Sequence, residues 1–336
     1  MIQNKKILII RLSTIANIVL ASPIIRCVKK QIPNVELHFL SNTDCKRATD
    51  YNPYIDKFYF FDNFLDHTIK QLLPESYDYI IDLECNNESK KLIKVLNVKT
   101  YSAKSFSLKN KLLTLLKINL FPNKHVVHRF FDTVLPLHVK DDGEGLDFFI
   151  AKNDEVPVDD LPTAHSAGYY VLNIAGKNFT NRMPIQKCIE LCNKLKHPII
   201  IVGNREDMLA GAQIAAQDTI KIYNACGKFN HGEIANIIQK AKVVIGNVNE
   251  LMYIACAFKK PIVALWGSNS SKFGAEPFYG QNFLQKQQKQ TFANITLNLQ
   301  CQPCSEVGFS TCPKKHFNCM QKIDINELLS QINLIY

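Results

Sequence analysis

Short apolar runs alternate with segments of helical period twice along this chain, and this alternation most constrains how it can fold. Residues 7–12 form the first run, whose polar flanks predict a short, buried parallel strand. Residues 17–30 then carry apolar side chains at helical spacing, and Pro33 ends the expected helix. The other expected strands are 35–40, 58–61, 79–83, 169–174, 198–203, 220–223, 243–246 and 262–266.

Two such series predict an α/β protein with two Rossmann-like, doubly wound domains that face a cleft. The 336 residues suit about two domains of ordinary size. The acid-, Gly- and Pro-rich stretch 141–167 is interpreted as the region between them. The predicted parts are an N-terminal domain over 1–150, a C-terminal domain over 168–322 that includes a Cys-rich tail, and a C-terminal helix over 323–336.

Composition and missing motifs exclude several classes of protein. No run of about 18 uncharged apolar residues is present, so we expect no membrane-spanning helix. Lys6 and Arg11 argue against a cleaved secretion signal, and we expect a cytoplasmic protein. The first strand–helix loop, residues 11–17, has no glycine, and the chain contains neither G-x-G-x-x-G nor a P-loop motif. A nicotinamide-dependent dehydrogenase and a P-loop ATPase are therefore disfavoured.

Positive charge is concentrated in one stretch. The chain has 40 basic and 30 acidic residues, yet residues 89–131 contain no acid. The cations of this stretch are Lys90, Lys91, Lys94, Lys99, Lys104, Lys109, Lys111, Lys117, Lys124 and Arg129. Such a stretch predicts attraction to phosphates, anionic lipid head groups or nucleic acid, and a solvated lysine-rich face is the alternative interpretation. Residues 108–121 within it predict a helix with a broad apolar face.

The last four of the eleven cysteines form a cluster in the sequence. Cys301, Cys304, Cys312 and Cys319 have the spacing C-x2-C-x7-C-x6-C. Four soft ligands in so short a segment could hold a structural zinc ion. Because the second pair does not repeat the short spacing, a Cys-rich turn without metal and a redox pair stay open as alternatives.

Five segments carry a resemblance to a known family. They are ILIIRLSTIANIVLASPIIRCVKK, IAGKNFTNRMP, IYNACGKF, ELMYIACAFKKPIVALWGSNSSKFGAEPFY and the tail CQPCSEVGFSTCPKKHFNCM. In this order they resemble motifs of the lipopolysaccharide heptosyltransferases, glycosyltransferase family 9, whose members begin with a strand followed by R-x-S-S-x-G-D. The resemblance runs nearly from end to end.

The resemblance implies a two-lobed GT-B fold with ADP-heptose in the C-terminal lobe and a lipid-linked core oligosaccharide on the N-terminal lobe. It implies inverting transfer in one displacement, an Asp after the first strand as general base, and no cofactor. Cations and helix-start N–H groups would stabilise the departing diphosphate. The implied location is the inner face of the cytoplasmic membrane, on an anionic surface.

On the acceptor side, this chain departs from the family motif. Asn17 occupies the position of the family's general base, and a carboxamide can orient a hydroxyl but cannot take its proton. Capping of the helix is the other interpretation of Asn17. Ser13 and Thr14 are expected to contact the acceptor or to serve as turn hydroxyls. Three carboxylates near strand ends could replace the base: Asp44, Asp82 and Glu84.

On the donor side, the family motif D-[ST]-G-x-x-H is also altered. The residues here are Val248, Asn249, Glu250, Leu251, Met252 and Tyr253. A glycine at a helix start lets N–H groups approach a phosphate, whereas a carboxylate repels it, by roughly 4 kcal/mol for unit charges about 4 Å apart at an effective dielectric constant near 20. Tyr253 is interpreted either as packing or as a phosphate-binding hydroxyl in place of the family's His.

The loop after strand 169–174 supplies the remaining expected donor contacts. They are Lys177, Thr180, Asn181 and Arg182. Asn181 falls where relatives often carry Lys, and Arg182 could contact a phosphate through two N–H groups. The alternative interpretation of Lys177 and Arg182 is that they are surface cations. Trp266 is interpreted as a core residue rather than a platform for a base.

The sequence is compatible with three candidate functions. The first is an inverting glycosyltransferase that resembles ADP-heptose:lipopolysaccharide heptosyltransferase, with a weakened or repositioned base. The second is a catalytically inactive relative that binds a glycan, a nucleotide or a partner enzyme, because loss of both the base and the diphosphate loop is what relaxed demand for chemistry would leave. A nucleic-acid binder ranks last, because no recognised module is present.

Overall fold

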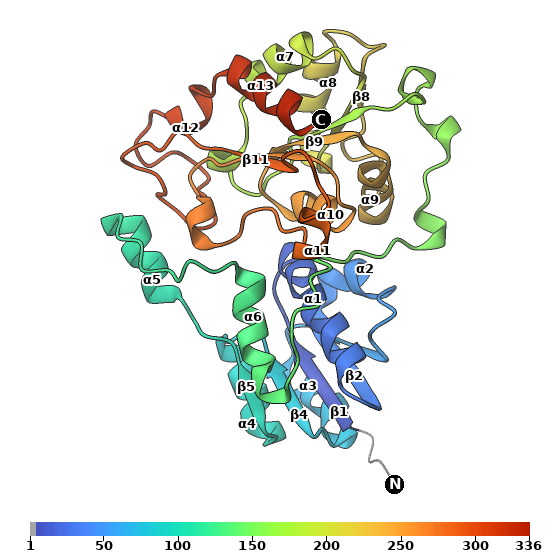
Figure 1. Cartoon of the computed structure of the whole chain (residues 1–336), viewed down its shortest axis with the longest axis vertical. Helices are drawn as coiled ribbons and strands as arrows, with labels where there is room; N and C mark the ends of the chain where they lie inside the picture. The colour runs from blue at the N-terminus through green and yellow to red at the C-terminus, as the bar shows by residue number, and fades with distance from the viewer. Residues whose placement is uncertain (1–4) are drawn as a thin grey trace. The chain divides into compact units, whose positions relative to one another are not determined.

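The computed structural model describes residues 5–336, apart from the side chain of Val158. The chain divides into two compact units. Unit 1 contains the residues up to Phe106 together with Asn123–Phe149, and unit 2 contains Ser107–Pro122 and Ile150–Tyr336. Each unit is built on its own parallel β-sheet (Figure 1).

Unit 1 has a five-stranded sheet in the order β3-β2-β1-β4-β5. Its strands are β1 (Lys5–Ile10), β2 (Val35–Asn42), β3 (Lys57–Phe61), β4 (Tyr79–Asp82) and β5 (Thr100–Ser102). Its helices are α1 (Ile15–Gln31), α2 (Lys46–Thr49), α3 (Leu65–Leu72), α4 (Asn87–Leu96) and α6 (Val126–Val134). Apolar side chains of α3 and α4 pack on one face of the sheet, and α1 packs against α6.

Unit 2 has a six-stranded sheet in the order β11-β10-β9-β6-β7-β8. Its strands are β6 (Tyr170–Asn173), β7 (Ile199–Val202), β8 (Ile222–Asn224), β9 (Val243–Asn247), β10 (Ile262–Leu265) and β11 (Phe292–Ile295). Its helices are α5 (Ser107–Lys111), α7 (Ile185–Lys194), α8 (Met208–Ala215), α9 (His231–Lys240), α10 (Glu250–Ala257), α11 (Gln281–Leu284), α12 (Asn318–Gln321) and α13 (Ile325–Ile335). Figure 1 shows α7, α8 and α13 on one face of this sheet and α9 and α10 on the other.

The strand order reverses once in each unit. In unit 1 the reversal lies between β1 and β4, where Ile10 is opposite Asp82. In unit 2 it lies between β6 and β9, where Asn173 is opposite Gly246. Open α/β sheets bind ligands beyond the carboxyl ends of the strands at such reversals, so the two places are the first candidates for functional sites.

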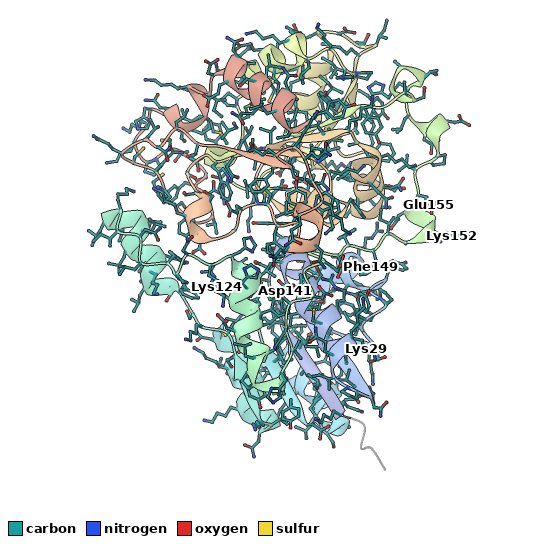
Figure 2. The ribbon with its side chains drawn as sticks, viewed as in Figure 1. Lys29, Lys124, Asp141, Phe149, Lys152 and Glu155 are labelled. Carbon is teal, nitrogen blue, oxygen red and sulfur yellow. The ribbon has the colours of Figure 1, made fainter. Side chains whose placement is uncertain are left out.

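Buried ion pairs hold the segment 141–149, through which the chain leaves unit 1. Figure 2 labels the two ends of this segment, Asp141 and Phe149. The guanidinium of Arg26, in α1, donates to both carboxylate oxygens of Asp142 at 2.7 and 2.8 Å and to the carbonyl of Gly145 at 2.9 Å. It also pairs with Asp147. Because Arg26 is only 2% exposed, this pairing holds the segment firmly against α1.

The prediction of two doubly wound α/β units is confirmed, with differences in detail. The edge strands β5 and β11 were not among the expected strands. The helix expected over 108–121 is shorter, because α5 is followed by a π-helical turn, Leu112–Leu116, and Lys117 then adopts φ +61°. Within the described part of the chain, no helix combines the length and the hydropathy needed to cross a bilayer.

Candidate functional site

The carboxylate of Glu84 joins the ends of β1 and β4 in unit 1. Its Oε2 accepts hydrogen bonds from the backbone N–H of Leu12 at 3.0 Å and from the hydroxyl of Ser13 at 2.8 Å, and it lies 3.4 Å from Nη1 of Arg11. Its Oε1 accepts a longer bond from Asn86, at 3.3 Å. The side chain is 11% exposed. Glu84 is therefore held in one orientation, and its second oxygen keeps room to accept a further bond.

Arg11 balances this carboxylate from the end of β1. Its Nη1 also donates to the carbonyl of Leu83, and its guanidinium lies 5.1 Å from the ring centre of Phe130. Burial lowers the pKa of Arg11, while Glu84 acts in the opposite direction. The Nε of Arg11 is buried and has no hydrogen-bond partner among the described residues. A buried donor without a partner is costly, so Arg11 weakens the stability of this loop while it pairs with Glu84.

Asn17 lies in the first turn of α1, and the interpretation that it caps this helix is wrong. Because α1 begins at Ile15, the cap position falls to Thr14, whose side chain makes no capping bond. The amide of Asn17 donates to the Thr14 hydroxyl at 3.3 Å. Of the two expected acceptor ligands, Ser13 is engaged by Glu84 and Thr14 is exposed.

The three carboxylates proposed as replacement bases differ in their surroundings. Asp82 is 1% exposed and accepts bonds from the N–H groups of Glu84 and Cys85 and from the Ser89 hydroxyl, so it closes the turn after β4. Asp44 is exposed in a short turn after β2. Within residues 5–336, Glu84 is the one of the three whose carboxylate accepts hydrogen bonds from the loop after β1.

Carboxamides join the strand ends at the reversal in unit 2. Asn173 donates to Asn249 Oδ1 at 2.8 Å and to the backbone carbonyl of Asn247 at 3.2 Å. Asn247 donates to the carbonyl of Ala175 and accepts from the N–H of Met183, both at 3.1 Å. Sequence reasoning missed Asn173 and Asn247. Their signal was that two apolar strand runs end in Asn.

Close approach of β6 and β9 depends on a glycine. Gly246 has φ +147°, and a Cβ there would lie 2.2 Å from the backbone carbonyl of Asn173. No side chain fits at that distance, so the asparagine network requires Gly246.

The start of α10 carries the predicted donor-binding residues 249–253. Asn249 caps the helix by accepting from the N–H of Leu251 at 3.0 Å. Leu251 and Met252 are core residues. The hydroxyl of Tyr253 donates to the carbonyl of Ala275 at 2.7 Å, and burial raises its pKa well above the ordinary value, so the geometry favours packing for this residue.

Glu250, the first residue of α10, is half-buried. Among residues 5–336, its carboxylate accepts no hydrogen bond and forms no ion pair, in contrast to Glu84. A carboxylate at this position faces the positive end of the helix dipole. It therefore competes with any phosphate that approaches the same N–H groups.

Arg182 and Lys177, the two expected cations of the β6–α7 loop, have different environments. The guanidinium of Arg182 pairs with Asp207 at 2.7 Å and with Glu206 at 2.8 Å. Lys177 is exposed, and no ion pair of its ammonium group is found within the described chain. Arg182 is thus already neutralised by its neighbours, and Lys177 is the more available cation.

Thr180 and Asn181 are buried and connect the β6–α7 loop to other loops of unit 2. The Thr180 hydroxyl lies 2.8 Å from that of Ser268, and Asn181 Oδ1 accepts from the same Ser268 hydroxyl at 2.7 Å. Asn181 also donates to the carbonyl of Val307 at 3.0 Å. Trp266 is 2% exposed, which agrees with its interpretation as a core residue.

The four cysteines of the tail gather in one region without forming a closed metal site. Burial raises the pKa of Cys319 to about 12, and Cys304, Cys301 and Cys312 reinforce the shift. Four sulfurs around zinc lie about 3.8 Å apart, given a Zn–S distance near 2.3 Å. No three of these thiols and His316 have ligand atoms within 4.8 Å of one another in the part of the chain described. The arrangement does not fit a preformed zinc tetrahedron.

A second possible ligand set lies at the amino ends of the strands in unit 1. The ligand atoms of Glu36, His38 and Glu75 lie within 4.8 Å of one another. Lys6 Nζ is 2.8 Å from Glu75 and 3.4 Å from Glu36, and Lys57 also pairs with Glu75. These lysines already supply the positive charge that a metal would bring, so the set is an ion-pair network.

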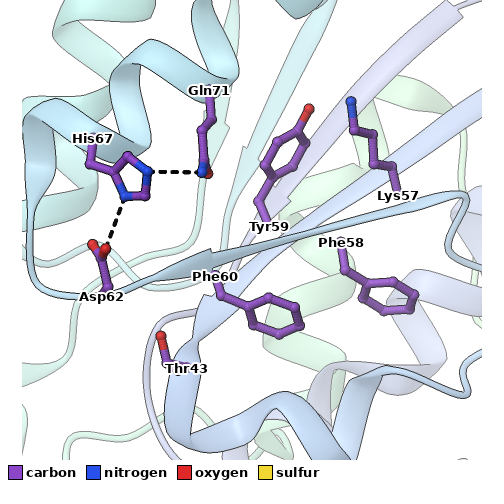
Figure 3. Close-up of a pocket in the computed structure, with 8 residues that line it drawn as sticks. All are labelled: Thr43, Lys57, Phe58, Tyr59, Phe60, Asp62, His67 and Gln71. Atoms are coloured by element: carbon purple, nitrogen blue, oxygen red, sulfur yellow. Dashed lines mark hydrogen bonds and ion pairs between the residues drawn. The ribbon is translucent and has the colours of Figure 1, made fainter.

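A hollow of about 580 Å³ in unit 1 lies along the edge strand β3. Figure 3 shows His67 between Asp62, at 2.9 Å, and Gln71, at 3.2 Å. The rings of Phe58 and Phe60 stack with centres 6.5 Å apart. None of the predicted site residues lines this hollow.

Comparisons with known proteins agree with this architecture. A family model described as glycosyltransferase family 9 (heptosyltransferase) matches residues 66–311, more than half of the chain. Lipooligosaccharide heptosyltransferase 2 of Campylobacter jejuni is 28% identical over 141 residues, which cover 40% of this chain and 40% of that protein.

Solved structures are similar over nearly the whole chain. A glycosyl transferase of family 9 from Veillonella parvula has a TM-score of 0.78 and 16% identity, covering 100% of this chain and 98% of that one. ADP-heptose lps heptosyltransferase II of E. coli has a TM-score of 0.70 and 15% identity, with 98% of each chain covered. E. coli heptosyltransferase WaaC with ADP also has a TM-score of 0.70 at 15% identity, covering 98% of this chain and 100% of that one. At these identities the similarity establishes the fold.

Proposed function

Because the chain belongs to glycosyltransferase family 9, the heptosyltransferase family, we propose that it transfers a sugar from an ADP-sugar donor to a lipid-linked core oligosaccharide. The family match over residues 66–311 supports the reaction class. Structures of the same fold were solved with ADP and with ADP-2-deoxy-2-fluoro heptose, which supports heptose as the donor sugar. The protein is proposed to be cytoplasmic and peripheral on the membrane that carries its acceptor.

Donor binding is assigned to unit 2, at the carboxyl ends of β6 and β9. The carboxamides of Asn173 and Asn249 are uncharged, so they do not repel a diphosphate. Lys177 supplies a cation, and the N–H groups at the start of α10 supply donors, for which the diphosphate competes with the half-buried carboxylate of Glu250. Arg182 contributes to a phosphate contact only by exchanging one of its carboxylate partners, Asp207 or Glu206.

Proton removal is assigned to Glu84 in unit 1, not to the position of Asn17. The observation that carries this assignment is that Glu84, at the β1–β4 reversal, accepts bonds from Leu12 and Ser13 and keeps a lightly used oxygen. The donors around Oε2 hold the carboxylate in one orientation, so that Oε1 is the oxygen that takes the proton.

The proposed step is a single displacement. An acceptor hydroxyl oxygen bonds to the anomeric carbon while the bond from that carbon to the diphosphate oxygen breaks. The hydroxyl proton passes to Glu84, and ADP leaves with the electron pair of the broken bond. The anomeric configuration inverts, and no metal takes part in the step.

Calorimetry with ADP tests the donor assignment. The wild-type protein is expected to bind ADP with micromolar affinity, and Lys177→Ala to bind about tenfold more weakly, as loss of one phosphate contact predicts. Lys196→Ala is the matched control. Lys196 is exposed and precedes the amino end of β7, whereas Lys177 follows the carboxyl end of β6.

Arg182→Ala combines direct and structural effects, because it also leaves the buried Asp207 without its cation, so Lys177→Ala is the cleaner test of a phosphate contact. Absence of ADP binding at millimolar concentration in the wild-type protein contradicts the proposal. ADP binding without turnover on any acceptor favours the inactive relative that binds nucleotide.

A further inference from the structure

The segment Ser107–Pro122 of unit 2 exposes an unusual number of aliphatic side chains. It comprises α5, the π-helical turn and the irregular residues 117–122 that follow. The exposed side chains are Leu108 (74%), Leu115 (75%), Leu116 (61%), Ile118 (47%) and Leu120 (51%). Exposed aliphatic residues gathered in one short segment mark a surface that contacts something apolar.

This segment is attached to the rest of unit 2 by specific contacts. The ammonium group of Lys117 donates to the backbone carbonyls of Cys301 at 3.0 Å and Pro303 at 2.7 Å. The ring of Phe121 meets that of Phe273 edge-on, with centres 5.7 Å apart. Leu113 is buried and anchors the helical part. The exposed leucines therefore project from a fixed base.

The segment combines apolar and basic residues, as interfacial segments do. Leu108 lies in α5, and Leu115 and Leu116 continue the exposed leucines through the π-helical turn. Lys109 and Lys111 lie between them in the sequence, and long lysine side chains can reach a charged plane while apolar side chains lie deeper. The segment contains no acidic residue, and neither does the longer stretch 89–131.

We propose that Ser107–Pro122 inserts its exposed aliphatic side chains into the interfacial region of an anionic lipid bilayer. The charge pattern is complementary to anionic head groups and would repel a basic partner. Protein interfaces are enriched in Trp, Tyr and Arg, and the segment has none of these residues. The inference deepens the proposed function, because a lipid-linked acceptor lies at such a surface.

Vesicle sedimentation with the full chain tests the insertion. Vesicles that contain phosphatidylglycerol in phosphatidylcholine are expected to bind the protein more tightly than phosphatidylcholine alone. Leu115→Asn/Leu116→Asn is expected to weaken binding by about tenfold or more, since two apolar side chains leave the bilayer. Leu209→Asn is the matched control, because Leu209 is 80% exposed on α8 of the same unit.

Tryptophan fluorescence adds a readout of depth. In Leu115→Trp, vesicles are expected to shift the emission to shorter wavelength, whereas Leu209→Trp is expected to show no shift. The native Trp266 is buried and gives a constant background. Salt is expected to weaken the binding without abolishing it, because only the electrostatic part is screened.

Several results would overturn the inference. They are equal vesicle binding by the wild-type and the double variant, absence of an emission shift in Leu115→Trp, and a dimer in light scattering that the double variant abolishes. ADP affinity and transfer to a delipidated acceptor are expected to be unchanged in the double variant. If vesicles bind but no transfer occurs, the proposed function fails and the inference stands. If transfer occurs without vesicle binding, the reverse holds.

Discussion

Unit 1 and unit 2 reverse their strand order in the same way but join the strand ends with different chemistry. In unit 1 the ionised side chains of Arg11 and Glu84 connect the loops, and in unit 2 the carboxamides of Asn173 and Asn249 do so. A carboxylate can take a proton, whereas a carboxamide cannot. A neutral network tolerates a diphosphate, whereas a carboxylate repels it. The proposed function rests on this difference, with proton transfer in unit 1 and donor binding in unit 2.

The largest expected effect is on the rate of transfer, at Glu84 beside the β1–β4 reversal. Glu84→Gln keeps the shape of the side chain and an oxygen that accepts hydrogen bonds, but it removes the base. We therefore expect kcat to fall by about 10²–10⁴-fold. The measurement is the initial rate of ADP release from ADP-heptose with a core oligosaccharide acceptor. Asp44→Asn, at an exposed carboxylate outside the reversal, should retain the wild-type rate. A fully active Glu84→Gln protein would remove Glu84 from the reaction.

Substitution in the asparagine network at the β6–β9 reversal is expected to lower the free energy of unfolding. Asn247→Ala leaves the buried N–H of Met183 without its partner and removes one of the two bonds to the carbonyl of Ala175, which keeps Asn249. We expect a loss of about 1–3 kcal/mol in the free energy of unfolding. Denaturant titration measures the loss. Asn326→Ala, at an exposed position of α13, should change stability by no more than about 0.5 kcal/mol. Equal effects of the two substitutions would show that the network adds nothing.

Acid is expected to weaken unit 1 through its ion-pair network. Lys57, Lys6 and Tyr59 hold the pKa of Glu75 at about 2, below its ordinary 4.5, and burial lowers the pKa of His38. Both pKa values are lower in the folded state than in the unfolded chain. The contribution of the two groups to the free energy of unfolding is therefore complete above about pH 6.5. It decreases first as the unfolded chain protonates His38, and further below about pH 4.5 as the unfolded chain protonates Glu75.

We expect this loss to reach about 1 kcal/mol or more between pH 7 and about pH 4. Hydrogen exchange of the β2 amides, compared with the β9 amides, measures it, because the asparagine network next to β9 contains no titrating group. Glu75→Gln should flatten the pH dependence in β2. An equal acid sensitivity of β2 and β9 would contradict this account.

The smallest effect is expected at Asn17. Asn17→Asp adds a negative charge in the first turn of α1, which stabilises the helix by about 0.3–1 kcal/mol through its dipole. Thermal unfolding measures that gain. If Glu84 is the base, the rate of transfer should stay within about threefold of wild type. A rise of a hundredfold or more would return the role of base to position 17.

The sequence predicted the architecture better than it predicted the site. Buried parallel strands are continuous apolar runs, which made the central strands visible. The edge strands β5 and β11 escaped because Thr100–Ser102 is only three residues long and Phe292–Ile295 mixes polar with apolar residues. The grouping of Ser107–Pro122 with unit 2 depends on contacts such as that from Lys117 to Pro303, which no local pattern encodes.

The site residues were harder to predict, because their roles depend on partners far away in the sequence. Arg182 is a candidate phosphate ligand by its place in the loop, yet Asp207, twenty-five positions later, already pairs with it. Glu84 could not be distinguished from Asp44 and Asp82 by its place near a strand end. Its bond to Ser13, seventy-one positions earlier, makes the distinction.

The central claim is that proton removal and donor binding belong to different units. ADP affinity and transfer rate, measured together on Glu84→Gln and Lys177→Ala, test it most directly. The account predicts that Glu84→Gln loses the rate and keeps the ADP affinity, while Lys177→Ala loses ADP affinity and, at saturating donor, keeps most of the rate. A Glu84→Gln protein that transfers sugar like the wild type, or that no longer binds ADP, would contradict it.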